Sequence, residues 1–437
     1  MHANSIIQTI SHTIESNHLF SKNEKIVIAL SGGIDSVVLT HVLHTLGYSI
    51  AVAHCNFHLR DQESNRDEEF VRSFAKTHNL VLHCTEFNTG KYAQKQSISI
   101  EMAARELRYA WFGELCAQYN YSKIAVAHNA NDSVETFFIN LLRSAGIKGL
   151  LGIPLRNGNI VRPMLSVWRS TIEEYAARNG IGFCFDSTNA EQDFVRNKIR
   201  LTLLPELQKI NAHAPQAIFN TIENLNKYYA LSQPYIDTLC EQLCSPTPYG
   251  LRVDEIALLQ HEFPEHVLYE ILSRYGFNAA QVRQIFACCS QQAGKQFFSA
   301  THAAYHDRNV LYIVLRETSH NVPKEIILNE LPQHNITIPQ GELEFSENTV
   351  TYTANVTGFK NLLHINPAKL QFPLTLRAWK AGDRIRLLGM KGTKKVSDVL
   401  IDAKVPRHHK AQVWVLESGG EIVWVIGYKQ TGALKNF

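Results

Sequence analysis

The chain has 437 residues, enough for two or three domains, and its 45% hydrophobic and 10% aromatic content excludes global disorder. No apolar run approaches the roughly 18 residues of a membrane span, and the N-terminus lacks the pattern of a secretory signal, so we expect a cytoplasmic protein. None of the eight cysteines forms a C-x-x-C pair, which favours reduced thiols. The net charge is only +3, but residues 377–410 hold ten Lys or Arg against three Asp.

The first two hundred residues alternate between strand-like and helical patterns. Ile6, Ile10 and Ile14 repeat at helical spacing and predict an N-terminal helix. Predicted strands then cover 26–30, 49–54, 80–87, 123–128 and 181–185. Predicted helices cover 35–46, 65–78, 99–119, 132–144 and 167–179. This alternation predicts an α/β domain at 1–213, with a parallel sheet, helices on both faces, and ligands beyond the carboxyl ends of the strands.

The rest of the chain predicts two further domains. Residues 214–318 show mainly helical patterns and are predicted to form a helical middle domain. From 326 to 437, short strand patterns predict a small, mixed, β-rich C-terminal domain. Its clearest signal is a hairpin in which Val413–Leu416 and Ile422–Ile426 flank the turn residues Ser418-Gly419-Gly420.

The loop Ser31-Gly32-Gly33-Ile34-Asp35-Ser36 follows the first predicted strand and opens a helix. Such a loop gathers backbone N–H groups around an anion, and its two glycines allow positive φ and close approach. Ser31 and Ser36 add hydroxyl donors, and Asp35 can hold a cation against a phosphate. The alternative is a glycine-rich turn without a ligand. The G-x-x-x-x-G-K-[ST] pattern is missing, so a γ-phosphate cradle is not indicated.

Other polar residues stand at predicted strand ends. His128 lies at the tip of the fourth strand, and Asp132 and Glu135 follow in the first turns of the next helix. A plain helix cap would explain the two acids but not the histidine. His54 and Asn56 follow the second strand, where they either contact a nucleotide's base or ribose or belong to a solvated loop.

Basic residues form the remaining candidates. Arg105 lies one helical turn after Glu101, which a surface ion pair would explain. Arg196 and Arg200 suit phosphate or carboxylate, or belong to a basic linker. The 377–410 segment suits a phosphate backbone, against the alternative of a solvated charged face.

These motifs carry a family resemblance. The 31–36 loop resembles the S-G-G-x-D-S loop of the ATP pyrophosphatase (PP-loop) superfamily, whose members grip pyrophosphate and transfer AMP to an oxygen. Taken in order, the chain resembles the tRNA(Ile)-lysidine synthetase family. The motifs that show this are S-G-G-x-D-S, H-x-N-x-x-L-R, E-x-A-A-R-x-x-R-Y, H-x-x-x-D-x-x-E-T, R-P-M-L, D-x-T-N at 186–189, R-N-x-I-R, and the C-terminal stretches 381–384, 388–390, 394–395 and 401–407. One departure is Asn131, because the family usually has two adjacent acids where this chain has Asn131-Asp132.

The resemblance implies a reaction and a set of roles. The wobble cytidine of the isoleucine tRNA with a CAU anticodon is adenylated by ATP at its C2 oxygen, and L-lysine then displaces AMP, giving lysidine, AMP and pyrophosphate. Mg²⁺ is the implied metal, with Asp35 and Asp132 as its ligands. The implied ATP-binding residues are Ala29, Ser31, Gly32, Gly33, Ile34, Asp35, Ser36, His54 and Asn56. The implied catalytic residues are Asp35, Arg105, His128, Asp132 and Glu135. The implied tRNA-binding residues are Arg196, Arg200, Arg384, Lys391, Lys394, Lys395, Lys404 and Arg407.

Other functions stay open. A tRNA thiolase of the same superfamily would want a reactive cysteine pair, which the sequence lacks. An NAD- or GMP-synthetase-like enzyme would leave the basic C-terminal segment unexplained. The alternative outside the enzymes is an RNA-binding protein with a vestigial nucleotide site. The sequence leaves a homodimer open and predicts no membrane partner.

Overall fold

The computed structural model describes the chain apart from residues 1–2, 60, 186–193, 248–249, 290–293, 317–324, 340, 347, 355–359, 365, 367–368, 388–389, 391, 411 and 432–437. It divides into two compact units, Met1–Leu231 and Ser232–Phe437. The boundary falls within the long helix α11 (Ala214–Leu243), so the predicted division into three domains stays a prediction. No described helix is both long and apolar enough to cross a membrane.

The first unit is built on a sheet in the order β3-β2-β1-β4-β6-β5. Its strands are β1 (Lys25–Ala29), β2 (Ser49–Asn56), β3 (Val81–Glu86), β4 (Lys123–Ala125), β5 (Arg156–Asn157) and β6 (Ile160–Val161). The pairs β1–β2, β1–β4, β2–β3 and β4–β6 are parallel, and β5 pairs with β6 in the antiparallel sense. β1 therefore lies inside the sheet, and its carboxyl end meets those of β2 and β4.

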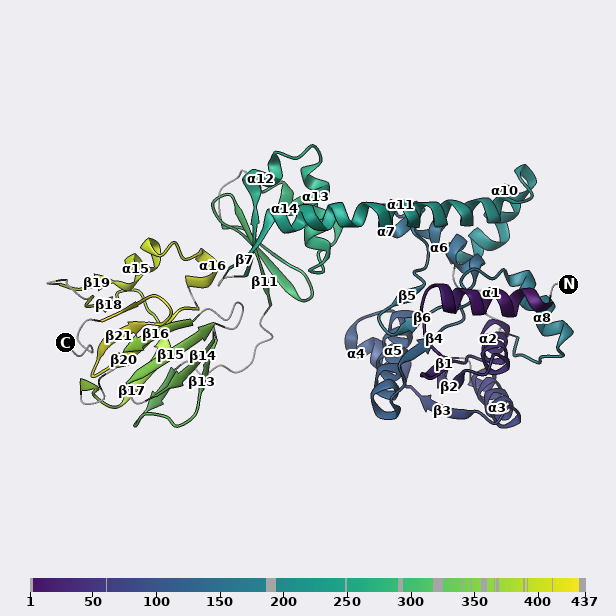
Figure 1. Ribbon diagram of the computed structural model, residues 1–437, viewed down its shortest axis with the longest axis horizontal. Coiled ribbons are helices and arrows are strands. Elements are labelled where there is room, and N and C mark those ends of the chain that lie inside the picture. The colour runs from purple at the N-terminus through teal and green to yellow at the C-terminus, as the bar shows by residue number, and fades with distance from the viewer. Residues whose placement is uncertain are drawn as a thin grey trace. The chain divides into compact units, whose positions relative to one another are not determined.

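Helices cover both faces of this sheet, as predicted (Figure 1). Successive side chains of a strand point to opposite faces. Ile26 and Ile28 accordingly join a core with α1 (Ala3–Ser16), α2 (Ile34–Thr45), α3 (Asp61–Thr77) and α8 (Arg169–Arg178). Val27 joins a second core with Phe112 and Leu115 of α5 (Ile100–Tyr119). The other helices of this unit are α4 (Thr89–Gln96), α6 (Ala130–Leu142), α7 (Ile147–Leu150), α9 (Phe194–Lys198), a π-helix (Ile199–Leu203) and α10 (Leu204–Ile210).

The strand predicted at 181–185 is wrong. These residues form an extended loop beside the 31–36 loop, where the N–H of Cys184 donates to the carbonyl of Gly32 at 2.9 Å. Past β4 the sheet continues instead into the short hairpin β5–β6. The N–H of Cys184 is instead taken by the Gly32 carbonyl, so this segment is held against the 31–36 loop and does not extend the sheet.

The second unit begins with a region in which helices and a sheet pack together. The predicted helical character is confirmed by α11, α12 (Glu255–Leu259), α13 (Pro264–Ser273) and α14 (Ala279–Phe286). These helices share a core with an antiparallel sheet that the sequence pattern did not predict. Its strands, in the order β7-β8-β11-β10-β9, are β7 (Cys244–Thr247), β8 (Gly250–Asp254), β9 (Gln296–Phe298), β10 (His302–His306) and β11 (Val310–Leu315).

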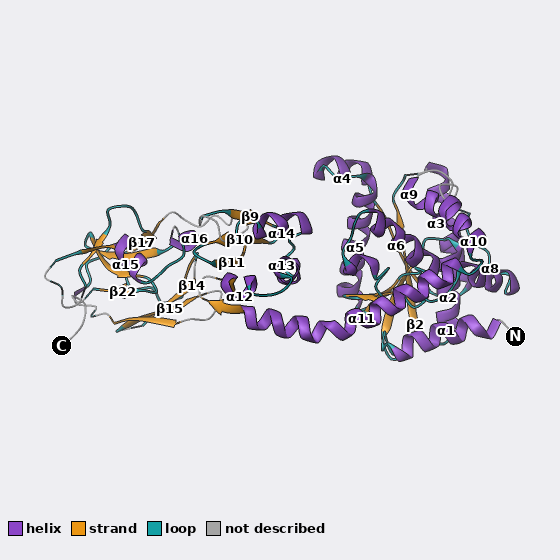
Figure 2. Ribbon diagram, turned by 90° about the horizontal axis from the view of Figure 1, so that it is seen from above, coloured by secondary structure: helices purple, strands orange, loops and turns teal. Residues whose placement is uncertain are grey.

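The remainder is rich in strands, as predicted, and Figure 2 shows them in orange. One sheet holds β12 (Glu325–Leu328), β17 (Leu374–Ala378), β18 (Arg384–Ile385), β19 (Lys394–Lys395), β20 (Trp414–Ser418), β21 (Glu421–Val425) and β22 (Lys429–Gln430). The other holds β13 (Ile336–Ile338), β14 (Gly341–Phe345), β15 (Thr349–Ala354) and β16 (Lys360–His364). Two short helices, α15 (Val396–Asp402) and α16 (Arg407–Lys410), complete this part. The predicted hairpin is β20–β21, and its buried Trp414 and Trp424 join residues of both sheets in one core.

A matched pair of leucines in the first unit tests this packing. Leu39 of α2 is fully buried, whereas Leu142 at the end of α6 is 69% exposed. We expect Leu39→Ala to lower the free energy of unfolding by about 2–5 kcal/mol, because it leaves a cavity, and Leu142→Ala to change it by less than about 1 kcal/mol. Native-state hydrogen exchange of the β1 and β2 amides measures both, and equal losses would contradict the core described above.

Candidate functional site

The loop between β1 and α2 is a closed turn held by its own serines. The Ser36 hydroxyl donates to the Gly33 carbonyl at 2.9 Å and accepts the N–H of Ser31 at 3.2 Å. Gly32 has φ +90°, a left-handed conformation that favours glycine, as predicted. Gly33 has φ −71°, so the expectation of positive φ there is wrong. Gly33 instead caps α2 without a side chain, which leaves the start of the helix open to an anion.

A cavity of about 460 Å³ lies at the carboxyl ends of β1, β2 and β4. It brings together most of the predicted nucleotide and catalytic residues, namely Ala29, Ser31, Asp35, Ser36, His54, Asn56, Arg105 and His128. The cavity is also lined by Phe57, Arg108 and Tyr109, which the sequence analysis did not select. Gly32, Gly33, Ile34, Asp132, Glu135, Arg196 and Arg200 are not among its lining residues.

Two polar residues at the end of β2 are fixed by hydrogen bonds. His54 is buried, which lowers its pKa, and its Nδ1 lies 2.9 Å from the Leu30 carbonyl. A carbonyl only accepts, so Nδ1 holds the proton and Nε2 is left as an acceptor. The Asn56 amide donates to Glu68 Oε2 at 2.9 Å and accepts the N–H of His58 at 3.0 Å. Asn56 therefore joins the end of β2 to α3.

His128 is a neutral imidazole. Its burial lowers its pKa to about 4, and its Nδ1 accepts a hydrogen bond of 3.1 Å from Arg162 Nε. Arg162 is buried and also donates to the Pro154 carbonyl at 2.6 Å. With Nδ1 accepting, the proton of His128 sits on Nε2. His128 is thus suited to donate a hydrogen bond at neutral pH, and poorly suited to act as a base.

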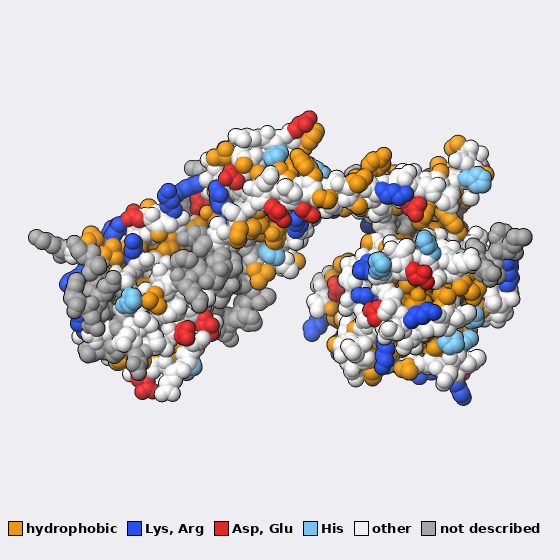
Figure 3. All heavy atoms as spheres, viewed as in Figure 1, with side chains coloured by type: hydrophobic (Ala, Val, Ile, Leu, Met, Phe, Trp, Pro, Cys, Tyr) orange, Lys and Arg blue, Asp and Glu red, His pale blue; other side chains and the backbone are white. Residues whose placement is uncertain are grey.

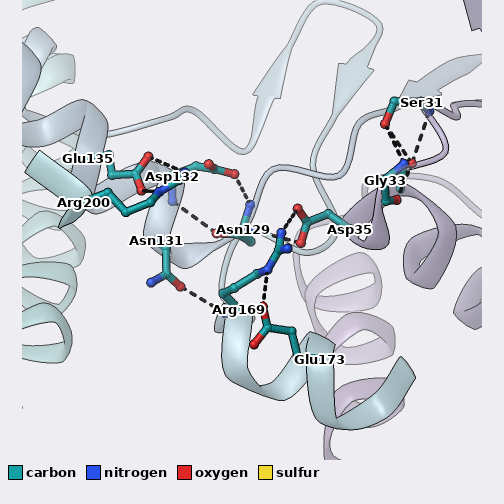
Figure 4. Close-up of polar contacts among 11 residues, drawn as sticks. Ser31, Gly33, Asp35, Asn129, Asn131, Asp132, Glu135, Arg169, Glu173 and Arg200 are labelled. Atoms are coloured by element: carbon teal, nitrogen blue, oxygen red, sulfur yellow. Dashed lines mark hydrogen bonds and ion pairs between the residues drawn. The ribbon is translucent and has the colours of Figure 1, made fainter. Parts of the chain in front are cut away.

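Asp35 is the electrostatic centre of the site (Figure 4). Arg169, at the start of α8, donates from Nη1 to Asp35 Oδ2 at 2.5 Å, and Asn129 Nδ2 lies 3.3 Å from Asp35 Oδ1. Burial raises the pKa of Asp35 to about 6, against the opposing effect of Arg169 and with a further increase from Asp132. Asn129 donates to both carboxylates, from its side chain to Asp35 and from its backbone N–H to Asp132, and so brings the two acids near each other.

Asp132 takes part in a capping box, but its partner is Asn129, whereas the plainer alternative paired Asp132 with Glu135. The N–H of Asn129 donates to Asp132 Oδ2 at 2.9 Å, and the N–H of Asp132 donates to Asn129 Oδ1 at 3.2 Å. Only one carboxylate oxygen, Oδ2, belongs to this cap. Asp132 Oδ1 therefore stays outside the cap.

Glu135 is engaged by two of the predicted RNA-binding arginines. Its carboxylate is 1% exposed and accepts two hydrogen bonds from Arg200, at 2.6 and 3.0 Å. Arg196 Nε lies 3.3 Å from Glu135 Oε2. Burial raises the pKa of Glu135, and the Arg200 guanidinium opposes that increase. The three side chains form one cluster that links α6 to α9 and the π-helix.

Asn131 has a structural partner. Its Oδ1 accepts the backbone N–H of Arg169 at 3.0 Å and so fixes the start of α8 (Figure 4). The sequence analysis did not select Arg169 or Arg162. Arg162 opens the R-P-M-L motif, which was a signal for it, whereas no local pattern marks Arg169 as the partner of Asp35.

The predicted tRNA-binding residues of the second unit differ in their surroundings. Lys394 pairs with Asp402, and Arg384 donates to Thr393 Oγ1 at 2.7 Å. Lys395 and Lys404 are exposed. Lys391 and the side chain of Arg407 lie outside the described residues, as does the 186–189 motif. On the face seen in Figure 3, the Lys and Arg side chains of this unit are dispersed.

Comparison with known proteins agrees with this architecture. Residues 3–207 match a family described as a PP-loop domain, residues 249–317 a TilS substrate binding domain, and residues 374–436 a TilS substrate C-terminal domain. The first unit therefore belongs to the PP-loop class of nucleotide-binding proteins, with its S-G-G-x-D-S loop after the central strand of a parallel sheet and a cavity beside that loop.

Relatives over nearly the whole length identify the family. The chain is 43% identical to the tRNA(Ile)-lysidine synthase of Bacteroides thetaiotaomicron, over 97% of this chain and 95% of the relative. It is 41% identical to that of Parabacteroides distasonis, with the same coverage. The chain therefore belongs to the tRNA(Ile)-lysidine synthase family, and the resemblance seen in the sequence is confirmed. A solved U34-tRNA thiolase, NcsA from Methanococcus maripaludis, is similar over 50% of this chain and 77% of its own, with 13% identity and a TM-score of 0.42.

The raised pKa of Asp35 predicts a pH dependence of stability. The folded chain holds this proton up to a pH of about 6, whereas an unfolded aspartate loses it near its ordinary pKa of 3.8. As the pH rises from 4 to 6, the free energy of unfolding of the wild type should therefore fall by on the order of 1–3 kcal/mol relative to that of Asp35→Asn. Urea unfolding at several pH values with a chelator present measures this. If the free energies of unfolding of the two proteins change with pH in the same way, burial does not raise the pKa of Asp35.

Proposed function

We propose that this enzyme forms lysidine at the wobble cytidine of the isoleucine tRNA with a CAU anticodon. ATP transfers AMP to the C2 oxygen of the cytidine with loss of pyrophosphate, and the amine of L-lysine then displaces AMP. The main support is the cavity that joins the S-G-G-x-D-S loop to polar strand ends, in a chain whose relatives over 97% of its length are tRNA(Ile)-lysidine synthases.

The 31–36 loop is proposed to hold the leaving pyrophosphate. Its open helix start offers backbone N–H donors to phosphate oxygens, which stabilises charge that develops as the bond to the α-phosphate breaks. Asp35 and Asp132 fit a Mg²⁺ ion, because they are neighbouring carboxylates and Mg²⁺ prefers oxygen ligands from one or two carboxylates together with phosphates. Bound there, the ion would supply charge neutralisation of the phosphates.

Activation of lysine is proposed to depend on Asp132. The ε-amine has a pKa of about 10.4 and must lose a proton before it can attack. His128 has no free lone pair for this proton, because its Nδ1 accepts from Arg162 and its Nε2 carries a hydrogen, and both oxygens of Glu135 already accept from Arg200. Asp132, with one oxygen outside its helix cap, is the acid best placed to bind the ammonium group and accept its proton.

Binding of the tRNA is proposed to use the exposed lysines of the second unit. Anticodon loops are single-stranded, so unstacking the cytidine costs only a few kcal/mol. Phosphate contacts then supply affinity but no sequence readout. Lys395 and Lys404 suit this role, since neither is covered in the structure. A cytoplasmic location and a homodimer also belong to this proposal as predictions.

Thiolation is the second enzymatic candidate, and the thiols argue against it. Cys55 lines the cavity, but burial raises its pKa to about 12. Burial also raises the pKa of Cys184, beside Gly32, to about 11. Sulfur transfer requires a thiolate, which these surroundings disfavour.

Mass spectrometry of tRNA nucleosides after incubation with ATP and lysine tests the proposed function. We expect one lysidine per CAU isoleucine tRNA, with pyrophosphate release that requires tRNA and goes beyond one pyrophosphate per enzyme-bound tRNA only when lysine is present. Binding of tRNA without pyrophosphate release would instead indicate an RNA-binding protein with a vestigial nucleotide site.

Asp132→Asn tests the proposed base. An asparagine oxygen can still accept the N–H of Asn129, so the helix cap and the melting temperature should be retained. We expect kcat to fall by at least about 100-fold, as for loss of a general base, while the Kd for tRNA changes less than about twofold. Turnover at the wild-type rate would remove Asp132 from the mechanism.

Lys394 and Lys395 provide a matched pair for the RNA contact. Lys394 pairs with Asp402, whereas Lys395 is exposed. We expect Lys395→Glu to weaken tRNA binding and to reduce the slope of log Kd against log salt by about one, the value for one phosphate contact. Lys394→Glu should change both the affinity and the slope less. Filter binding at several salt concentrations measures both, and an unchanged affinity for Lys395→Glu would exclude it as a contact.

A further inference from the structure

Arg169 is held at three points, and only one of them belongs to the 31–36 loop. Its backbone N–H donates to Asn131 Oδ1 at 3.0 Å, and its Nε donates to Glu173 Oε1 at 2.8 Å. Its Nη1 donates to Asp35 Oδ2 at 2.5 Å. The main chain and Nε are therefore fixed by residues outside the loop, and Nη1 alone reaches into it (Figure 4).

The Arg169 guanidinium competes for the carboxylate that the proposed function gives to a divalent cation. Both are positively charged and would approach Asp35 from a few ångströms apart, where like charges repel. An anion that enters between them relieves this repulsion. The anion of the proposed reaction, pyrophosphate, is bound by the same loop.

We propose that Arg169 exchanges partners during the reaction. Its guanidinium neutralises Asp35 while no anion occupies the loop, and it donates to the pyrophosphate group of ATP once nucleotide is bound. This inference rests on the proposed function for the identity of the anion. It assigns a leaving-group contact to a residue on α8, a helix that contributes no residue to the lining of the cavity.

The chemistry of the side chain suits both partners. A guanidinium has five N–H donors in a planar fork, which matches carboxylate and phosphate oxygens alike. The Arg169 side chain is 39% exposed, so a new partner can reach it. Asn131 and Glu173 keep the backbone and Nε in place, so the exchange requires movement only at the end of the side chain.

A double-mutant cycle on pyrophosphate binding tests the exchange. Calorimetry with inorganic pyrophosphate and the full chain, without divalent cations, compares the wild type, Asp35→Asn, Arg169→Gln and the double variant. We expect Arg169→Gln to weaken binding at least tenfold. We expect Asp35→Asn to tighten binding, and the factor by which it does so should be at least five times larger in the wild-type background than in the Arg169→Gln background. Only the wild-type background has a guanidinium that the substitution can release.

The difference between the effects of Asp35→Asn in the two backgrounds shows whether Arg169 exchanges partners. If Asp35→Asn changes affinity by the same factor in both backgrounds, the carboxylate acts only by repelling the anion, and the proposal is overturned. An unchanged affinity in Arg169→Gln also overturns it. Arg169→Lys, which keeps the charge and loses the fork, should bind with intermediate affinity and serves if Arg169→Gln does not fold.

Glu174→Gln is the matched control. It removes a charge from α8 at a side chain that pairs with Arg178, and we expect its affinity for pyrophosphate to stay within about threefold of the wild type. In turnover assays, the KM for ATP should rise in Arg169→Gln while the Kd for tRNA without ATP is unchanged.

The calorimetry needs neither tRNA nor lysine, so it separates this proposal from the proposed function. A wild type that forms no lysidine but shows the expected double-mutant cycle would refute the proposed function and leave the partner exchange of Arg169 standing.

Discussion

The negative charge of Asp35, held in the first turn of α2, organises the site. Burial alone would favour its protonated form, and the structure opposes this with the Arg169 guanidinium and the Asn129 amide. Arg169 comes from α8 and Asn129 from the start of α6, so the Asp35 carboxylate links α2 to both of these helices. A site of this kind is prepared to receive cations and anions together, because its charges are already balanced before a substrate arrives.

The sequence predicted the parts of the fold that follow a strong local pattern. The parallel strands β1 to β4, the helices between them and the hairpin β20–β21 all lie close to the predicted positions. The hairpin β5–β6 was missed because strands of two residues leave no periodic signal. Val310–Leu315 is an apolar run of strand length, yet a short run of this kind cannot be told from a buried helix segment, so the sheet of the middle region was not predicted.

The candidate site shows the same limit more sharply. Motifs at strand ends brought Asp35, His54 and His128 to one cavity, because the topology of a parallel sheet determines that arrangement. The partners of charged residues depend on side-chain geometry instead, and spacing does not encode it. The residue types of Arg196 and Arg200 suited phosphate or carboxylate, and only the structure identifies the buried carboxylate of Glu135 as their partner, while the RNA contact stays a prediction. Likewise Arg377, counted in the basic segment, is nearly buried between Asp383 and Glu417.

The single carboxamide of Asn129 performs two tasks at once. Its oxygen accepts the N–H of Asp132 at the first turn of α6, and its nitrogen donates to Asp35. An aspartate would keep the first contact but set two negative charges against each other, while serine or threonine would keep the first and lose the reach for the second. A substitution at this position therefore changes the start of a helix and the charge balance of the loop together.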